Sequence, residues 1–182
     1  MDKDKNKNTI RIAGVIGDSI VDGPGLRLTI FVQGCPHNCE GCHNPETHDF
    51  DGGTEYELES FTHNIIDELD CNPILSGVTF SGGEPMCQPS ALLYIAKKVV
   101  EKGKNIVIFS GYTFEELMNM SKSNCSIKEL LELSILLVDG KFELKNRNLA
   151  IKFRGSTNQR LIDPKASIKE GKIIEWKSKF DI

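Results

Sequence analysis

The chain has 182 residues and a formal net charge of −4. Its length corresponds to one domain, since single domains usually hold about 100–200 residues. An apolar fraction of 39% and a charged fraction of 26% exclude wholesale disorder. The acidic balance argues against a nucleic-acid partner, because proteins built to bind nucleic acid usually carry a basic face.

The chain begins with a polar stretch, and residues 1–9 are predicted to be a flexible tail. Residues 10–182 are expected to fold as a single domain with a short C-terminal extension. The first apolar stretch is interrupted by Arg11 and Asp18, so it is no signal peptide. No apolar run approaches the roughly 20 residues that span a bilayer. We therefore expect a cytoplasmic protein with no membrane partner, where thiols stay reduced and grouped cysteines bind metal or do redox chemistry.

Strands are predicted from short runs of β-forming residues bounded by glycine or polar residues. These runs are residues 26–33, 78–80, 106–109, 135–138 and 151–153, with a terminal ribbon over 160–162 and 172–176. Helices are predicted from apolar residues three and four positions apart, over residues 58–69, 90–102, 115–120 and 127–133. Capping boxes are indicated at Thr54 with Glu57, Thr113 with Glu116, and Ser126 with Glu129.

The predicted elements alternate between strand and helix, which is typical of an α/β fold with a mostly parallel sheet and helical crossovers. A polar, glycine-bearing segment follows each of the five strands, at residues 34–44, 81–85, 110–112, 139–141 and 154–158. Because parallel strands end at one edge of the sheet, these segments are expected to converge on a single large site.

Three of the six cysteines, Cys35, Cys39 and Cys42, lie within eight residues with C-x3-C-x2-C spacing. Thiolates suit iron–sulfur clusters, zinc and copper(I). Zinc stays open because His37 and His43 could complete a four-ligand site, although no second C-x2-C arm is present. The favoured interpretation is a [4Fe-4S] cluster whose fourth iron is left for an exogenous ligand.

Four other residues receive a more ordinary interpretation. His37 is interpreted as a loop residue, and the isolated Cys71, Cys87 and Cys125 as packing residues, because free cysteine behaves as a small apolar side chain. Residues 22–25, Asp-Gly-Pro-Gly, form either a simple turn or part of the site lining.

The cysteine spacing and its neighbours resemble the radical S-adenosylmethionine (SAM) superfamily. That resemblance implies that SAM binds the open iron and is cleaved to methionine and a 5′-deoxyadenosyl radical. Residues 81–85, Ser-Gly-Gly-Glu-Pro, resemble the superfamily segment that receives the SAM amino group. Glycines there allow close backbone approach, and their carbonyls accept from an ammonium group.

Within the superfamily, residues 21–27 and 42–47 resemble glycyl-radical-enzyme activases. Residues 138–142 and 153–160 resemble the activating proteins of anaerobic ribonucleoside-triphosphate reductases, and the likeness extends over about residues 12–162. It implies an oxidoreductase whose partners are the large reductase subunit and a flavodoxin- or ferredoxin-like electron donor. Activation of another glycyl-radical enzyme, of the formate acetyltransferase type, and a non-catalytic zinc or iron–sulfur protein remain as alternatives.

The resemblance also implies site residues. The cluster ligands and catalytic residues are Cys35, Cys39 and Cys42. Contacts with SAM are expected from Gly41, Cys42, His43, Gly82, Gly83, Glu84, Asp139, Lys141 and Arg154. Among these, Lys141 would offset a carboxylate charge, Asp139 would orient it or approach the substrate peptide, and Arg154 would meet the SAM carboxylate or the partner surface.

Two positions depart from the superfamily pattern. Gly41 stands where many members carry an aromatic residue near the adenine, which leaves adenine contacts to the backbone of residues 41–43. Residues 110–112 replace an Asp-Thr pair of related activases, so no cation ligand is assigned there. The implied fold is a partial, open β/α barrel of the radical SAM type, because 182 residues fall short of the roughly 250 of a complete barrel.

Overall fold

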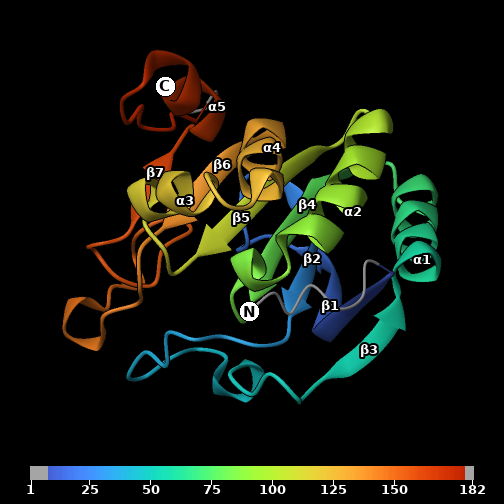
Figure 1. The fold of residues 1–182 in the computed structure, drawn as a ribbon, viewed down its shortest axis with the longest axis horizontal. Coiled ribbons are helices and arrows are strands. Elements are labelled where there is room, and N and C mark those ends of the chain that lie inside the picture. The colour runs from blue at the N-terminus through green and yellow to red at the C-terminus, as the bar shows by residue number, and fades with distance from the viewer. Residues whose placement is uncertain (1–7, 179–182) are drawn as a thin grey trace.

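The computed structural model describes residues 8–178, and within them seven strands form one sheet in the order β3-β1-β2-β4-β5-β6-β7 (Figure 1). The strands are β1 (Thr9–Ser19), β2 (Leu26–Val32), β3 (Thr54–Glu57), β4 (Leu75–Gly82), β5 (Asn105–Ser110), β6 (Ser134–Asp139) and β7 (Arg160–Ile162). The central strands β2, β4, β5 and β6 pair in parallel, while β1, β3 and β7 join through antiparallel pairings. Only β1 and β7 run against the others, which confirms the mostly parallel α/β sheet.

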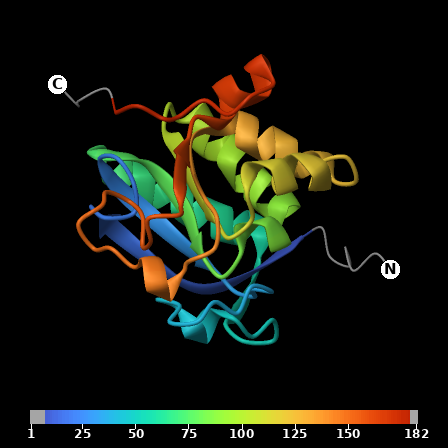
Figure 2. The same ribbon diagram turned by 90° about the vertical axis from the view of Figure 1, so that its left-hand side faces the viewer.

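Helices supply the crossovers that parallel strands require. They are α1 (Leu58–Cys71), α2 (Pro89–Glu101), α3 (Phe114–Met120), α4 (Cys125–Leu133) and α5 (Pro164–Glu170). In sequence, α1 leads into β4, α2 into β5, and α3 with α4 into β6. In space, α2 contacts both α1 and α4, and α4 contacts α3 and α5, so the helices form a row beside the sheet (Figures 1 and 2). Within residues 8–178 no helix is long and apolar enough to cross a membrane.

The two faces of the sheet differ in chemistry. On the face covered by helices, alternate strand residues such as Ile30, Phe80 and Ile108 are fully buried in the main core. On the opposite face, Val107, Leu136 and Val138 form a smaller apolar cluster, against which Phe153 and Trp176 pack. This second face continues to the strand ends, where the candidate site lies.

The buried guanidinium of Arg27 joins three strands on that second face. It donates to Thr79 Oγ1 at 2.9 Å, to the Val78 carbonyl at 2.6 Å and to Asn105 Oδ1. Burial lowers the pKa of Arg27 to about 10, and the nearby Asp22 carboxylate opposes that shift. Because a buried charge is costly unless it is paired and hydrogen-bonded, these contacts fix β2 against β4 and β5.

Most predicted elements are confirmed; β4, β5 and β6 are longer than expected, and β2 ends one residue earlier. The predicted strands at 26–33, 78–80, 106–109 and 135–138 correspond to β2, β4, β5 and β6, and the four predicted helices to α1–α4. The run at 160–162 is strand β7, and Glu175 makes a bridge to Ile162, so the terminal ribbon is reduced to one short strand and one bridge. The intervening α5 and the long β1 were not predicted.

Three predictions about local structure are wrong. Residues 151–153 form no strand, since Phe153 has φ of +59° and its ring packs edge-on against Trp176. Residues 54–57 form strand β3, and α1 is capped by the Glu57 carboxylate instead of by Thr54. Helix α4 is capped by the Asn124 side chain, two residues before the predicted cap.

The boundaries of the predicted tail also change. Thr9 already pairs with Glu57 in the sheet, whereas residues 1–7 of the predicted tail lie outside the described residues. The capping box of Thr113 with Glu116 at the start of α3 is confirmed.

Candidate functional site

A cavity of about 390 Å³ lies at the carboxyl ends of the parallel strands. Each of the five predicted strand-end segments contributes to its wall, as do residues before and within β2. Its polar and glycine lining consists of Asp22, Cys35, His37, Cys39, Cys42, His43, Asn44, His48, Ser81, Gly82, Gly83, Ser110, Gly111, Gly140, Gly155 and Gln159. The predicted convergence of these segments at one sheet edge is therefore found in the structure.

The cysteine loop, residues 34–48, begins directly after β2 and is closed at its base by backbone hydrogen bonds. The Gly34 N–H donates to the Thr47 carbonyl at 2.9 Å, and the Cys35 N–H to the His48 carbonyl at 3.1 Å. Within the loop Asn38 adopts φ of +47°, a left-handed conformation that asparagine tolerates better than most residues. The loop therefore folds back on itself and brings its three thiols to the same cavity wall.

The thiols lie in a partly dry environment with backbone N–H groups directed at them. Partial burial raises the pKa of the Cys35 thiol, and the backbone N–H groups of His37 and Asn38 oppose that shift. Partial burial and the neighbouring Cys42 raise the pKa of Cys39, while the Phe142 N–H and the charge of Lys141 act against it. Successive N–H groups around a left-handed turn form concavities that hold anionic groups, iron–sulfur sites among them.

Gly82 and Gly83 form the neighbouring wall at the end of β4. Gly82 has φ of +94°, and a Cβ on Gly83 would lie 2.5 Å from the Gly34 carbonyl oxygen. The Gly83 N–H donates to the Val32 carbonyl, and the Glu84 N–H donates to the Gly34 carbonyl, both at 2.8 Å. The glycine pair thus permits the closest backbone contact between β4 and the start of the cysteine loop.

The predicted SAM contacts divide into two groups in the structure. Cys42, His43, Gly82 and Gly83 line the cavity, whereas Gly41, Glu84, Asp139, Lys141 and Arg154 do not. Lys141 is exposed beside the cysteine loop, where its charge acts on Cys39. Gly41 packs against Leu144, and Arg154 lines two adjacent cavities beside Phe153.

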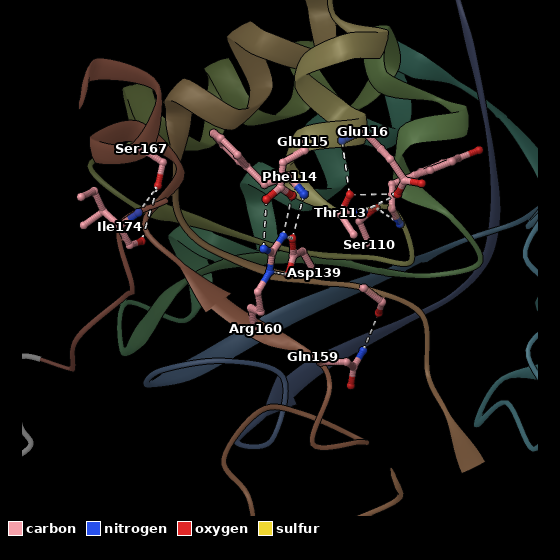
Figure 3. A network of polar contacts seen from close by, with 12 residues as sticks. Ser110, Thr113, Phe114, Glu115, Glu116, Asp139, Gln159, Arg160, Ser167 and Ile174 are labelled. Carbon is pink, nitrogen blue, oxygen red and sulfur yellow. Dashed lines mark hydrogen bonds and ion pairs between the residues drawn. The ribbon is translucent and has the colours of Figure 1, made fainter. Parts of the chain in front are cut away.

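The two predicted carboxylates are occupied by contacts within the protein. Asp139 is almost fully buried, and it accepts from Arg160 Nε at 2.9 Å and from the Phe114 N–H at 2.7 Å (Figure 3). Glu84 is fully buried and accepts four hydrogen bonds from neighbouring segments, His37 among the donors. Both side chains hold strand ends together behind the cavity wall.

Some residues of the site were not singled out from the sequence. Phe142 lines the cavity and lies against the His43 ring at a centroid distance of 4.9 Å. The side chain of Gln159 accepts from the Gly155 N–H at 2.8 Å. Its amide nitrogen donates to the Gly140 carbonyl at 3.0 Å (Figure 3). Its place in the predicted motif at 153–160 is the only sequence signal that points to it.

Three thiols on one loop, facing one cavity and approached by backbone N–H groups, fit an iron–sulfur cluster as a donor set. In the described part of the chain, no three His, Cys, Asp or Glu side chains come together around a single metal ion. A cluster requires no such convergence, because each of its thiolates binds a different iron.

A protein-family model first shows what kind of domain the chain contains. The model of a family described as "4Fe-4S single cluster domain" matches residues 21–162, a span that includes the whole cysteine loop. A solved structure of QueE from Escherichia coli aligns with a TM-score of 0.44 and 18% identity, over 58% of this chain and 53% of that one.

Similar curated proteins show to which family of iron–sulfur proteins the chain belongs. The anaerobic ribonucleoside-triphosphate reductase-activating protein of Vibrio cholerae is 36% identical over 144 residues, which cover 77% of this chain and 89% of that protein. The protein of the same name from Escherichia coli K12 is 33% identical over 77% of this chain and 90% of its own length. That of Enterobacteria phage T4 is 33% identical over 78% and 86%, respectively. The chain belongs to the family of anaerobic ribonucleoside-triphosphate reductase-activating proteins.

Proposed function

We propose that this protein generates a glycyl radical on the large subunit of an anaerobic ribonucleoside-triphosphate reductase, using SAM and a [4Fe-4S] cluster. The family membership supports the activating role, and the three thiols that line one cavity carry the proposal of a cluster. Held by these thiols, a reduced cluster would supply the electron for cleavage of SAM into methionine and a 5′-deoxyadenosyl radical, and that radical would take a hydrogen from a glycine Cα.

The chain's own residues would bind and orient the reacting groups, as is usual where a cofactor supplies the chemistry. Cys35, Cys39 and Cys42 would hold three irons. The backbone of Gly82 and Gly83 would receive the SAM amino group, since these glycines line the cavity next to the cysteine loop. The partly buried setting of the thiols would limit water at the reaction centre.

The remaining site residues would act around this centre. His43, at the cavity wall beside Phe142, and the backbone of residue 41 would border the adenine. Lys141 and Arg154, which lie outside the cavity lining, would meet the partner surface. Glu84 and Asp139 would act by holding the strand ends in place.

We further propose that residues 10–182 form one radical SAM domain, with the sheet curved into an open β/α barrel. An open side suits a protein substrate whose glycine loop must reach the cavity. The protein would work in the cytoplasm and take its electron from a flavodoxin- or ferredoxin-like donor.

The decisive experiment joins cluster assembly to radical formation. Anaerobic reconstitution should give about four irons per chain, as expected for one [4Fe-4S] cluster. Addition of reductant, SAM and the large reductase subunit should then give a glycyl-radical doublet by electron paramagnetic resonance. Cys39→Ala should abolish both signals, whereas Cys71→Ala, an exposed cysteine at the end of α1, should leave them unchanged.

Other results would select the alternatives. A colourless protein with one zinc per chain would contradict the cluster. A doublet that forms on a formate acetyltransferase-type enzyme, and never on the reductase subunit, would reassign the substrate within the activases.

A further inference from the structure

A buried hydrogen bond joins the first part of the cysteine loop to the segment after β4. His37 Nε2 lies 2.9 Å from Glu84 Oε2, and their side chains are only 5% and 1% exposed. His37 stands between Cys35 and Cys39, whereas Glu84 directly follows the glycine pair of the neighbouring wall. The bond therefore connects two walls of the same cavity.

Glu84 extends this connection to a third segment. Its Oε1 accepts from the Met86 N–H at 3.0 Å and from Ser110 Oγ at 2.9 Å, while Oε2 also accepts from the Gly111 N–H at 2.8 Å. Ser110 is the last residue of β5, so one carboxylate ties together the loops that follow β2, β4 and β5. All four partners can act as donors, a pattern that only a carboxylate with two accepting oxygens can satisfy.

The imidazole ring of His37 lies in a closely fitted position. The Tyr112 ring meets it edge-on at a centroid distance of 4.4 Å. A Cβ on Gly111 would lie 2.3 Å from His37 Cδ2, so the glycine at this position leaves the room that the ring occupies. Backbone, carboxylate and aromatic ring together hold His37 in one orientation.

We infer that His37 and Glu84 are positioning residues for the cluster. Their hydrogen bond, called the latch here, holds the cysteine loop against the strand ends and fixes the spacing of Cys35 and Cys39. The latch keeps the backbone N–H groups of His37 and Asn38 directed at the Cys35 thiol. This inference rests on the proposed function, since it assigns these residues a role toward the same cluster.

Three variants at His37 separate the hydrogen bond from the packing. His37→Phe keeps a ring beside Tyr112 and removes the donor. His37→Gln places an amide N–H near the former Nε2 position and should restore the bond to Glu84. His37→Asn has the same amide on a shorter side chain, which cannot span the distance. His63→Phe is the matched control, because His63 is 75% exposed on α1.

Glu84→Gln tests the other partner. Each carboxylate oxygen of Glu84 receives one backbone N–H, from Met86 or from Gly111. An amide has only one oxygen, so one of those N–H groups would face an NH2 group without an acceptor. We expect Glu84→Gln to lose iron faster than the removal of one charge alone would cause. Glu101→Gln, which removes the charge from an exposed ion pair, serves as its control.

The measurements are the rate of iron loss to a chelator and the electron paramagnetic resonance spectrum of the reduced cluster, with and without SAM. Residues that orient metal ligands typically change metal affinity by about 10–100-fold when they are replaced, so His37→Phe and His37→Asn should lose iron about tenfold faster or more. Their spectra should also change, whereas His37→Gln should approach the wild-type rate and spectrum. Melting of the metal-free proteins reports whether each variant folds.

The outcomes distinguish the latch from the proposed function. A wild-type protein that takes up no cluster would overturn the proposed function and the latch with it. A normal wild-type cluster, combined with equal iron loss and equal spectra in His37→Gln and His37→Asn, would overturn the latch alone. That comparison holds even where His37→Phe fails to fold.

Discussion

Gly82 is a position where backbone conformation and packing both exclude a side chain. Its φ is +94°, and a Cβ would lie 2.6 Å from Phe31 Cα in the neighbouring strand β2. Only glycine adopts such a conformation without strain, and only glycine allows this approach of two backbones. The residue therefore sets the distance between the cysteine loop and the end of β4.

We predict that Gly82→Ala lowers the free energy of unfolding by roughly 2–4 kcal/mol, because backbone strain and overpacking each cost about 1–3 kcal/mol. Urea denaturation of the metal-free protein measures this change. Gly14→Ala is the control, since a Cβ there meets nothing within 4 Å, and it should stay within about 0.5 kcal/mol of wild type. Equal stability of the two variants would contradict the packing argument.

At the scale of single residues, the sequence points to the three cysteines of the cavity wall more directly than to the residues that support their loop. The spacing of Cys35, Cys39 and Cys42 is local, so it can be read without a fold. The hydrogen-bond partner of His37 is Glu84, 47 residues away, and no local sequence pattern indicates such a pair. Glu84 was expected at SAM from the resemblance of residues 81–85, and Asp139 from its place at a strand end. Both carboxylates are buried and accept from backbone N–H groups, contacts that depend on the fold and not on a local pattern.

Helix and strand prediction failed mainly where periodicity was interrupted or misleading. Strand β1 contains Gly14 and Gly17 and two register shifts against β2, which hide its alternation. Residues 151–153 have the composition of a strand, yet they follow an irregular loop whose Phe153 packs on Trp176. The central strands were predicted because parallel strands buried on both faces give continuous apolar runs.

Arg160, at the start of β7, connects that strand to β6 and to α3. It donates to Asp139 through Nε and Nη2, and to Glu115 at 3.1 and 2.7 Å through Nη1 and Nη2 (Figure 3). These two carboxylates raise the pKa of Arg160, and Arg160 in turn holds the pKa of Glu115 below its ordinary value. The edge strand is thus fixed by charge as well as by three residues of backbone pairing.

We predict that Arg160→Gln destabilises the protein by about 2–3 kcal/mol, since the buried Asp139 carboxylate loses its charged partner while Arg160 itself is partly exposed. Thermal or urea unfolding checks this value, with Lys145→Gln as the control because that side chain is 80% exposed. An Arg160→Gln variant as stable as the control would refute the role of this contact.

The same contact predicts a pH dependence. Glu115 has a folded-state pKa below its ordinary value of 4.5, so its contribution to stability is complete above about pH 4.5 and is lost as the pH falls further. The stability difference between wild type and Arg160→Gln should therefore shrink below that pH. A difference that grows on acidification would contradict the assignment.

Over the whole molecule, stability should decrease from the centre of the sheet toward its edges. The central strands β4 and β5 are flanked on both sides and hold fully buried residues, whereas all four residues of β3 are exposed and pair only with β1. Regions with few buried apolar contacts open at low free energy.

We predict that backbone amides of β4 and β5 exchange with solvent only through global unfolding, while those of β3 exchange through local opening. Native-state hydrogen exchange across low urea concentrations measures this order. Strand β7, three residues long, should exchange earlier than β6, its partner. Uniform protection from β3 to β5 would contradict it.

The hydrogen bonds that shape the cysteine loop all run between parts of the polypeptide. The Gly34 and Cys35 amides, the glycine pair after β4 and the bond from His37 to Glu84 need no metal to form. Zinc fingers, in contrast, gain their fold from the metal and unfold without it. For the proposed cluster, we therefore expect assembly in two separate stages, in which the polypeptide folds first and receives iron and sulfide afterwards. A lost cluster could then be rebuilt on the same folded chain.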